Sequence, residues 1–336
     1  MTYSESDGRQ LVPTAERTRE GKLRRVGVEL EMQGLSVARL ASLVARHLDG
    51  EVTVISEYEH EVSGDAAGTW RIELDFDLLK RWGRAEQRGD GARAQIEQLA
   101  EDTLAAGSEV LVPMEVVSPP LPMGELARVD GLVRVLRDAG ARGTRDGLVY
   151  AFGMHFNPEL PDTDAATVTR YLKGFLCLYD WLKERSDPDL LRRLSVFIDP
   201  FPKEYLRMVL QPGYAPGLPD LIDDYLAHNP TRNRALDMLP LFAHLDERRV
   251  RSAIDDPRIK ARPTLHYRLP NCEIDEPGWG VTPAWRDWLR VERLAANPDA
   301  LSTLCAEYAD HLDQPLGRLV DPWLDHLESW LRTHDH

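Results

Sequence analysis

Two glutamates, Glu29 and Glu31, alternate with apolar residues in Arg25–Met32, and carboxylates with this spacing could bind a metal ion. Alternate residues of a strand point to opposite faces, so both side chains share one face, about 7 Å apart along the strand. Two ionised carboxylates repel each other, and a neighbouring cation favours their charged form. Mg²⁺ is the cation we expect, because it takes hard oxygen ligands and tolerates retained waters and phosphates.

The same alternation recurs in four later segments, each apolar on one side and polar on the other. They are Trp70–Asp77, Pro113–Pro120, Tyr150–Pro158 and Thr264–Asn271, and they carry Glu73, Glu115, His155 with Asn157, and Arg268 with Asn271, respectively. Alternation in one segment is typical of any strand with a solvated face. Asn, Asp and Glu are depleted in strands, however, and Gly27 and Gly153 leave room for a ligand beside the backbone. We therefore favour one shared polar site over five solvated faces.

Composition narrows the class of protein. The chain has 336 residues and a net charge of −15, from 56 acidic and 41 basic residues, which argues against nucleic acid as a partner. Three cysteines, far apart and without a Cys-x-x-Cys pair, predict neither a disulfide framework nor a zinc site and fit a reducing cytoplasm. The polar N-terminus has no signal-peptide core, and no stretch is apolar enough to span a bilayer. We expect a cytoplasmic protein with no membrane partner.

Strand patterns dominate the first part of the chain and helical patterns the second, which predicts the α+β class. A strand or a hairpin is expected over residues 51–61, and Pro119 and Pro120 should end their strand near Ser118. Helices are expected over 36–47, 92–106, 121–139, 164–184, 203–210, 218–228, 236–245, 281–296, 299–313 and 319–333. The only strand expected in the second half lies within 263–269.

Four motifs in this order resemble the amidoligase family, which belongs with glutamate–cysteine ligase and glutamine synthetase in the carboxylate–amine ligase superfamily. They are Gly27-Val-Glu-Leu-Glu31, Glu115-Val-Val-Ser-Pro119, Gly153-Met-His-Phe-Asn157 and His266-Tyr-Arg-Leu-Pro-Asn271. The resemblance covers residues 24–272 and implies a glutamine-synthetase-like curved antiparallel sheet with helices on its convex face. It suggests a catalytic domain over 23–280, strand-rich in 23–158 and helix-rich in 159–280. A flexible segment, 1–22, would precede it, and C-terminal helices in 281–336 would pack on the same domain.

The resemblance also implies a reaction. ATP phosphorylates a carboxylate to an acyl phosphate, and an amine from a small molecule or peptide then attacks to form an amide. The cofactors would be ATP and Mg²⁺ or Mn²⁺, since metal must neutralise charge when a carboxylate meets ATP. The implied metal ligands are Glu29, Glu31, Glu115 and His155. Glu73 and Arg268 are the implied catalytic residues, and Asn157, Arg268 and Asn271 the implied nucleotide contacts.

Three rival functions stay open. A guanidino-kinase-like phosphotransferase would use the same fold, although the motifs at Glu115 and His155 favour the ligase. A metal-dependent hydrolase would use the acids and His155 to activate water and would not need ATP. A non-catalytic binding protein is the third, and the presence of every proposed ligand argues against it. The substrates, the pathway, the number of metal ions and the oligomeric state are not readable from the residues.

Overall fold

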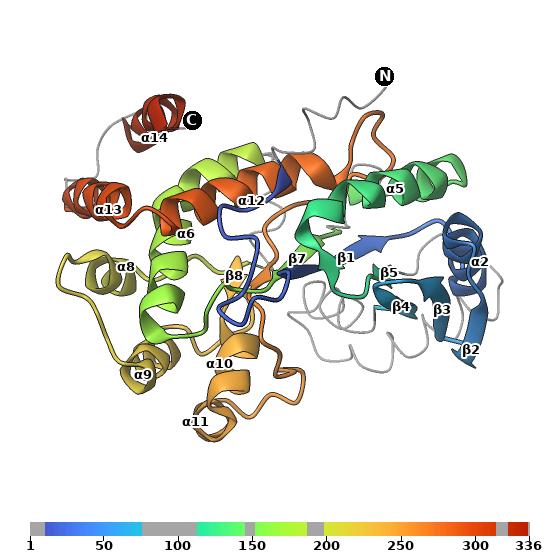
Figure 1. Cartoon of the computed structure of the whole chain (residues 1–336), viewed down its shortest axis with the longest axis horizontal. Coiled ribbons are helices and arrows are strands. Elements are labelled where there is room, and N and C mark those ends of the chain that lie inside the picture. Colours follow the sequence, from blue (N-terminus) through green and yellow to red (C-terminus); the bar gives the residue numbers. More distant parts are fainter. Residues whose placement is uncertain (1–10, 76–112, 145–151, 187–197, 314–321, 335–336) are drawn as a thin grey trace, which may run out of the picture. The chain divides into compact units, whose positions relative to one another are not determined.

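The computed structural model describes residues 11–75, 113–144, 152–186, 198–313 and 322–334 (Figure 1). The chain forms two compact units. We call residues 25–157 with 270–282 the sheet unit, and residues 1–24, 158–269 and 283–336 the helical unit. Each is considered separately below.

The sheet unit is built on strands in the spatial order β2-β3-β4-β5-β1-β7, with β6 paired to β1. Their bounds are β1 Arg25–Met32, β2 Val52–Ser56, β3 Glu59–Asp65, β4 Gly68–Leu74, β5 Met114–Val117, β6 Leu121–Pro122 and β7 Met154–Pro158. The pairs β2–β3, β3–β4, β4–β5 and β1–β5 are antiparallel. A large antiparallel sheet together with many helices confirms the predicted α+β class.

Registry separates the two faces of this sheet. Leu30 lies opposite Val116, which lies opposite Ile72, and all three are buried. The residues next to these in sequence are Glu31, Glu115 and Glu73. Their side chains lie on the opposite face, because neighbouring residues of a strand point to opposite faces. The predicted division into an apolar and an acidic face is therefore present, and it extends over several neighbouring strands.

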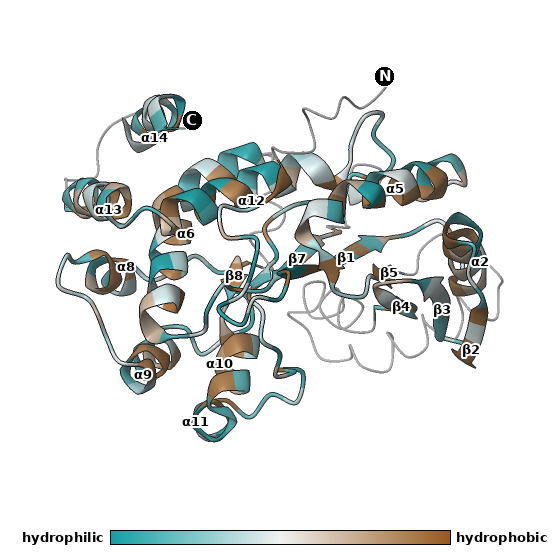
Figure 2. Cartoon of the chain, in the orientation of Figure 1, coloured by the Kyte–Doolittle hydropathy of each residue, from teal (hydrophilic) through white to brown (hydrophobic). Residues whose placement is uncertain are grey.

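Two helices cover the apolar face. α2 (Val37–Leu48) packs against β3 and β4, and α5 (Val129–Asp138) packs against α2. Their apolar residues gather along one side of each helix (Figure 2). Ser36 caps the N-terminus of α2, because its side chain accepts a hydrogen bond from the backbone N–H of Arg39.

The helical unit contains α6, α8 to α14 and a short strand pair. The bounds are α6 Ala165–Arg185, α8 Lys203–Leu210, α9 Leu218–His228, β8 Leu236–Asp237, α10 Leu239–Leu245, α11 Glu247–Ala253, β9 His266–Tyr267, α12 Val281–Ala295, α13 Pro298–Leu312 and α14 Pro322–His334. A buried ion pair lies in its core, where Arg24 contacts both carboxylate oxygens of Glu292 at 2.7 and 2.9 Å. The hydroxyl of Tyr171 donates to the same carboxylate at 2.5 Å.

Two predicted elements were wrong in part. The helix expected over 121–139 begins as β6 and continues as a 3-10 helix, η2 (Met123–Arg128), so that α5 starts only at Val129. The helix expected over 236–245 is preceded by β8, because Leu236 and Asp237 pair with β9. A strand of two residues is too short for periodicity to reveal. The helix expected over 92–106 lies outside the described residues.

Among the described residues, none of the helices has the length and apolar character that crossing a bilayer requires.

Candidate active site

Three carboxylates form a rung across the acidic face of the sheet. Glu31 on β1 lies opposite Glu115 on β5, and Glu115 lies opposite Glu73 on β4. Glu59 on β3 continues the same rung opposite Glu73. Directly opposite side chains on neighbouring strands lie within about 4.5–5.5 Å at Cβ, and like charges there destabilise the sheet. The structure therefore concentrates negative charge on the strands that carry three of the predicted residues.

Glu115 is the central and most perturbed member of this rung. Burial raises the pKa of Glu115 well above its ordinary value, and neighbouring carboxylates raise it further. Those neighbours are Glu29, Asp75, Glu31 and Glu73. No hydrogen-bond donor reaches Glu115 in the described part of the chain. A half-buried acid among acids, with no donor, is an arrangement that a cation would stabilise.

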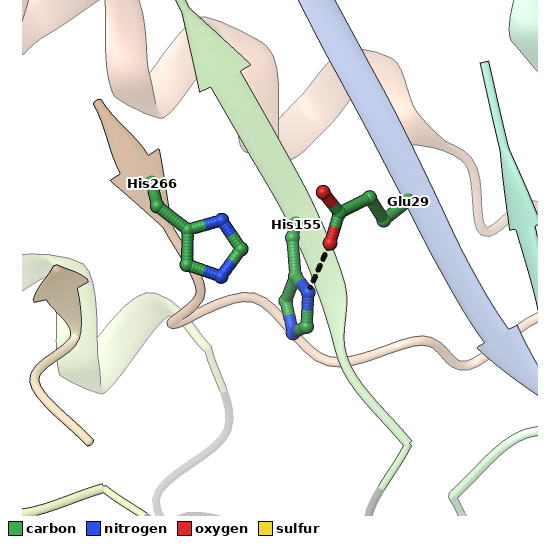
Figure 3. Close-up of side chains that lie close together, drawn as sticks. All are labelled: Glu29, His155 and His266. Atoms are coloured by element: carbon green, nitrogen blue, oxygen red, sulfur yellow. Dashed lines mark hydrogen bonds and ion pairs between the residues drawn. The ribbon is translucent and has the colours of Figure 1, made fainter. Parts of the chain in front are cut away.

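β7 supplies donors to the two acids of β1. The ring nitrogen Nδ1 of His155 lies 3.0 Å from Oε2 of Glu29 (Figure 3), and Nε2 lies 3.6 Å from Oε1 of Glu31. Asn157 donates its amide to Oε1 of Glu29 at 2.7 Å, and the backbone N–H of Gly153 donates to Oε2 of Glu31 at 2.6 Å. Glu29 and Glu31 are thus held in place by protein donors, with the imidazole between them.

Of the two glycines, Gly153 has a different use from the one predicted. A Cβ on Gly153 would lie 2.6 Å from Nε2 of His155, and a Cβ on Gly27 would lie 3.4 Å from Cβ of Asn157. At Gly153 the space beside the backbone is taken by the imidazole, and glycine there allows His155 to reach the acids of β1. At Gly27 a Cβ would make only an ordinary contact with Asn157, and the expectation of room for a ligand there stays a prediction.

The last two predicted residues, Arg268 and Asn271, are assigned to different units. Asn271 belongs to the sheet unit, where it forms a β-bridge with Gly153, and it is buried. Arg268 belongs to the helical unit, is buried, and donates from Nη1 to the carbonyl oxygen of Arg232 at 2.6 Å. Its predicted contact with a phosphate stays a prediction.

Two further acids were missed as site candidates. Asp75 follows β4, is buried, and adds to the charge that raises the pKa of Glu115. Its place in the alternation of Trp70–Asp77 was the available signal, whereas Asp77 lies outside the described residues. Asp237 of the helical unit is buried beside Arg268, Arg232 and Arg262, and burial raises its pKa to about 6 despite those cations. Asp237 lies in none of the alternating segments of the sequence, so the pattern did not identify it.

Cys272, which adjoins the motif that contains Arg268 and Asn271, is not an activated thiol. It is fully buried, and burial raises the pKa of its thiol well above the ordinary value. A reactive cysteine needs the opposite shift, because the thiolate is the nucleophile.

Residues 22–290 match the model of a protein family described as "Putative amidoligase enzyme". The match covers most of the chain, and the chain therefore belongs to this family. The predicted resemblance is confirmed, and membership of this family suggests a ligase-type enzyme. No curated protein and no solved structure matches the chain.

Proposed function

We propose that this member of the amidoligase family is an ATP-dependent carboxylate–amine ligase. It would transfer phosphate from ATP to a carboxylate and form an amide from the acyl phosphate and an amine. Mg-ATP would bind at the acidic face of the sheet unit, on a sheet curved as in glutamine synthetase. The observation that supports this best is the rung Glu31–Glu115–Glu73, with the carboxylate of Glu115 lacking a donor in the described residues.

The chemistry of the donors fits a divalent metal. Mg²⁺ prefers carboxylate oxygens and is bound through one or two of them together with phosphates and waters. Glu115 and Glu73 would hold it, since Glu29 and Glu31 already accept hydrogen bonds from β7. When bound, the metal neutralises the phosphate charge that would otherwise repel an incoming carboxylate.

The residues of β7 would act as positioning residues for this site. Asn157 and His155 fix both oxygens of Glu29, so its carboxylate cannot rotate freely. Preorganised groups of this kind stabilise developing charge without having to move during the reaction. Arg268 would stabilise charge on the transferred phosphoryl group, as the resemblance implies.

Trapping with hydroxylamine tests the proposal without knowledge of the natural amine. The purified chain is incubated with ATP, Mg²⁺ and a panel of carboxylic acids, and hydroxylamine converts any acyl phosphate to a hydroxamate. We expect hydroxamate together with ADP for at least one acid, and loss of both products in Glu115→Gln. Glu61→Gln is the matched control, because Glu61 lies on the same face opposite Arg71 instead of on the rung.

The rivals give different products in the same assay. A guanidino kinase would release ADP only with a guanidine acceptor and would form no hydroxamate. A hydrolase would turn over without ATP. ATP consumption without hydroxamate for any acid, while a guanidine accelerates it, would overturn the ligase in favour of the kinase.

A further inference from the structure

Among the described strands of the sheet unit, β2 is the one that exposes large apolar side chains. Val52, Val54 and Ile55 are 39%, 65% and 52% exposed, and all five residues of β2 are exposed. The fourth large apolar side chain exposed in the described part of the chain is Leu23, in the helical unit. The neighbouring strand β3 instead buries His60 and Val62. Exposed apolar residues gathered in one segment indicate an interaction surface.

Among the strands that the structure describes, β2 also stands at the end of the order, and its one pairing there is with β3. An edge strand offers N–H and C=O groups to another chain, and proteins usually blunt such edges with Lys, Pro or inward-pointing charges. The sequence Val-Thr-Val-Ile-Ser of β2 has none of these residues, and a register shift between Val54 and Ser56, of the kind that also blunts edges, is confined to its C-terminal end. Within the described residues, the outer edge of β2 at Val52–Val54 can therefore accept an added strand.

The two faces of β2 determine which strand fits. Val52 lies opposite Val62, and Val54 lies opposite His60, on the face that α2 covers further in. Apolar residues of an added strand would pack beside Val52 and Val54 on this face. On the other face Thr53 lies opposite Glu61, and Ser56 lies opposite Glu59. An added strand would lie beside Thr53 and Ser56, two strand spacings from these glutamates, so that long Lys or Arg side chains on it would extend toward them.

The charged ends of β2 disfavour the symmetric pairing of two copies that is centred on Val54. Antiparallel pairing of two β2 strands about Val54 would bring Glu51 of one copy opposite Glu57 of the other, at both ends. Like charges directly opposite destabilise a strand pair. Lys or Arg at those places would instead form favourable pairs with Glu51 and Glu57.

We propose that β2 is the docking edge for an extended segment of another protein in which apolar residues alternate with Lys or Arg. The segment adds a strand outside β2, with its apolar residues beside Val52 and Val54 and its basic residues opposite Glu51 and Glu57. Main-chain hydrogen bonds give such a complex its affinity, and alternate side chains give its specificity. This surface is separate from the residues assigned to the ligase reaction.

Binding of short peptides to the full chain tests the proposal. The probe is a capped peptide in which valine alternates with lysine, and one matched peptide has glutamate in place of lysine. A third has N-methyl groups on alternate residues, so that it cannot form a strand ladder. Titration calorimetry should show binding of the lysine peptide alone, weaker as salt is raised.

Variants locate the site. We expect Val54→Lys to weaken binding of the lysine peptide by roughly fivefold to tenfold, from one lost apolar pair and one added like charge. Leu23→Lys, which changes an exposed apolar residue elsewhere, should leave it unchanged. Equal binding of the glutamate or N-methyl peptide, or no binding of the lysine peptide, would overturn the proposal. A dimer in sedimentation that Val54→Lys dissociates would also overturn it, in favour of a second copy.

Discussion

Removing the charge of Glu115 should make the metal-free protein more stable. Glu115 lies directly opposite Glu31 on one side and Glu73 on the other, and it has no donor among the described residues. Opposed like charges cost roughly 0.2–1 kcal/mol per pair, so two pairs amount to about 1 kcal/mol. We expect Glu115→Gln to raise the free energy of unfolding by about this amount at neutral pH, or Tm by about 1–2 °C for a chain of 336 residues.

The gain should depend on pH with a definite sign. Because the pKa of Glu115 is raised in the folded state, the wild-type carboxyl contributes stability below its unfolded pKa and loses that contribution as the pH rises through the folded value. Glutamine does not titrate. The advantage of Glu115→Gln should therefore be absent near about pH 4 and grow toward neutral pH.

Urea unfolding in EDTA at several pH values measures this effect. Glu61→Gln is again the matched control and should show no such gain, since Glu61 lies opposite Arg71. Mg²⁺ should stabilise the wild type by preferential binding to the folded state and should stabilise Glu115→Gln less. A variant that is less stable than the wild type at neutral pH, or equally stable at every pH, would refute the view that repulsion at the rung is relieved by a cation.

Three other predictions concern stability. Asp237→Asn should stabilise the protein by about 3 kcal/mol at pH 8 and have no such effect near pH 4. The pKa of Asp237 is raised to about 6 in the folded state, so its ionisation costs stability as the pH rises through that value. Urea unfolding at both pH values checks this. Asn157→Asp should destabilise the protein by about 2 kcal/mol at neutral pH, since a carboxylate would replace the amide 2.7 Å from Glu29, and thermal unfolding should show recovery in acid. Arg24→Met should cost about 3–5 kcal/mol in urea unfolding, because it leaves Glu292 buried and uncompensated, and a loss below 1 kcal/mol would contradict this.

Local periodicity predicted the acidic face but not the rung. Alternation placed Glu29 and Glu31 on one face, and the prolines after Val117 placed the end of β5, since both effects act within a few residues. The alignment of Glu31, Glu115 and Glu73 depends on registry between segments that are distant in sequence, which no single segment encodes. The role of Gly153 could not be predicted for a similar reason. Glycine is required there because a Cβ would collide with the imidazole of His155, and sequence patterns do not show where that ring lies.

The sequence of β1 alone suggested that Glu29 and Glu31 require a metal ion between them. Whether they do depends on the neighbouring strand, which β1 does not encode. His155 and Asn157 donate to Glu29, and the backbone of Gly153 donates to Glu31. Much of the repulsion on β1 is thus offset by the protein itself. Among the described residues, no hydrogen-bond donor reaches Glu115, on the neighbouring strand β5. Its environment is determined by burial and by the registry of the strands together.

Calorimetric titration of ATP into the purified chain, with and without Mg²⁺, tests the central claim most directly. We predict binding that requires Mg²⁺ in the wild type and in Glu61→Gln, and that is lost in Glu115→Gln although this variant is folded and more stable. Binding of ATP that is equally tight without any divalent metal, or that survives in Glu115→Gln, would contradict the assignment of the acidic rung as the site of Mg-ATP.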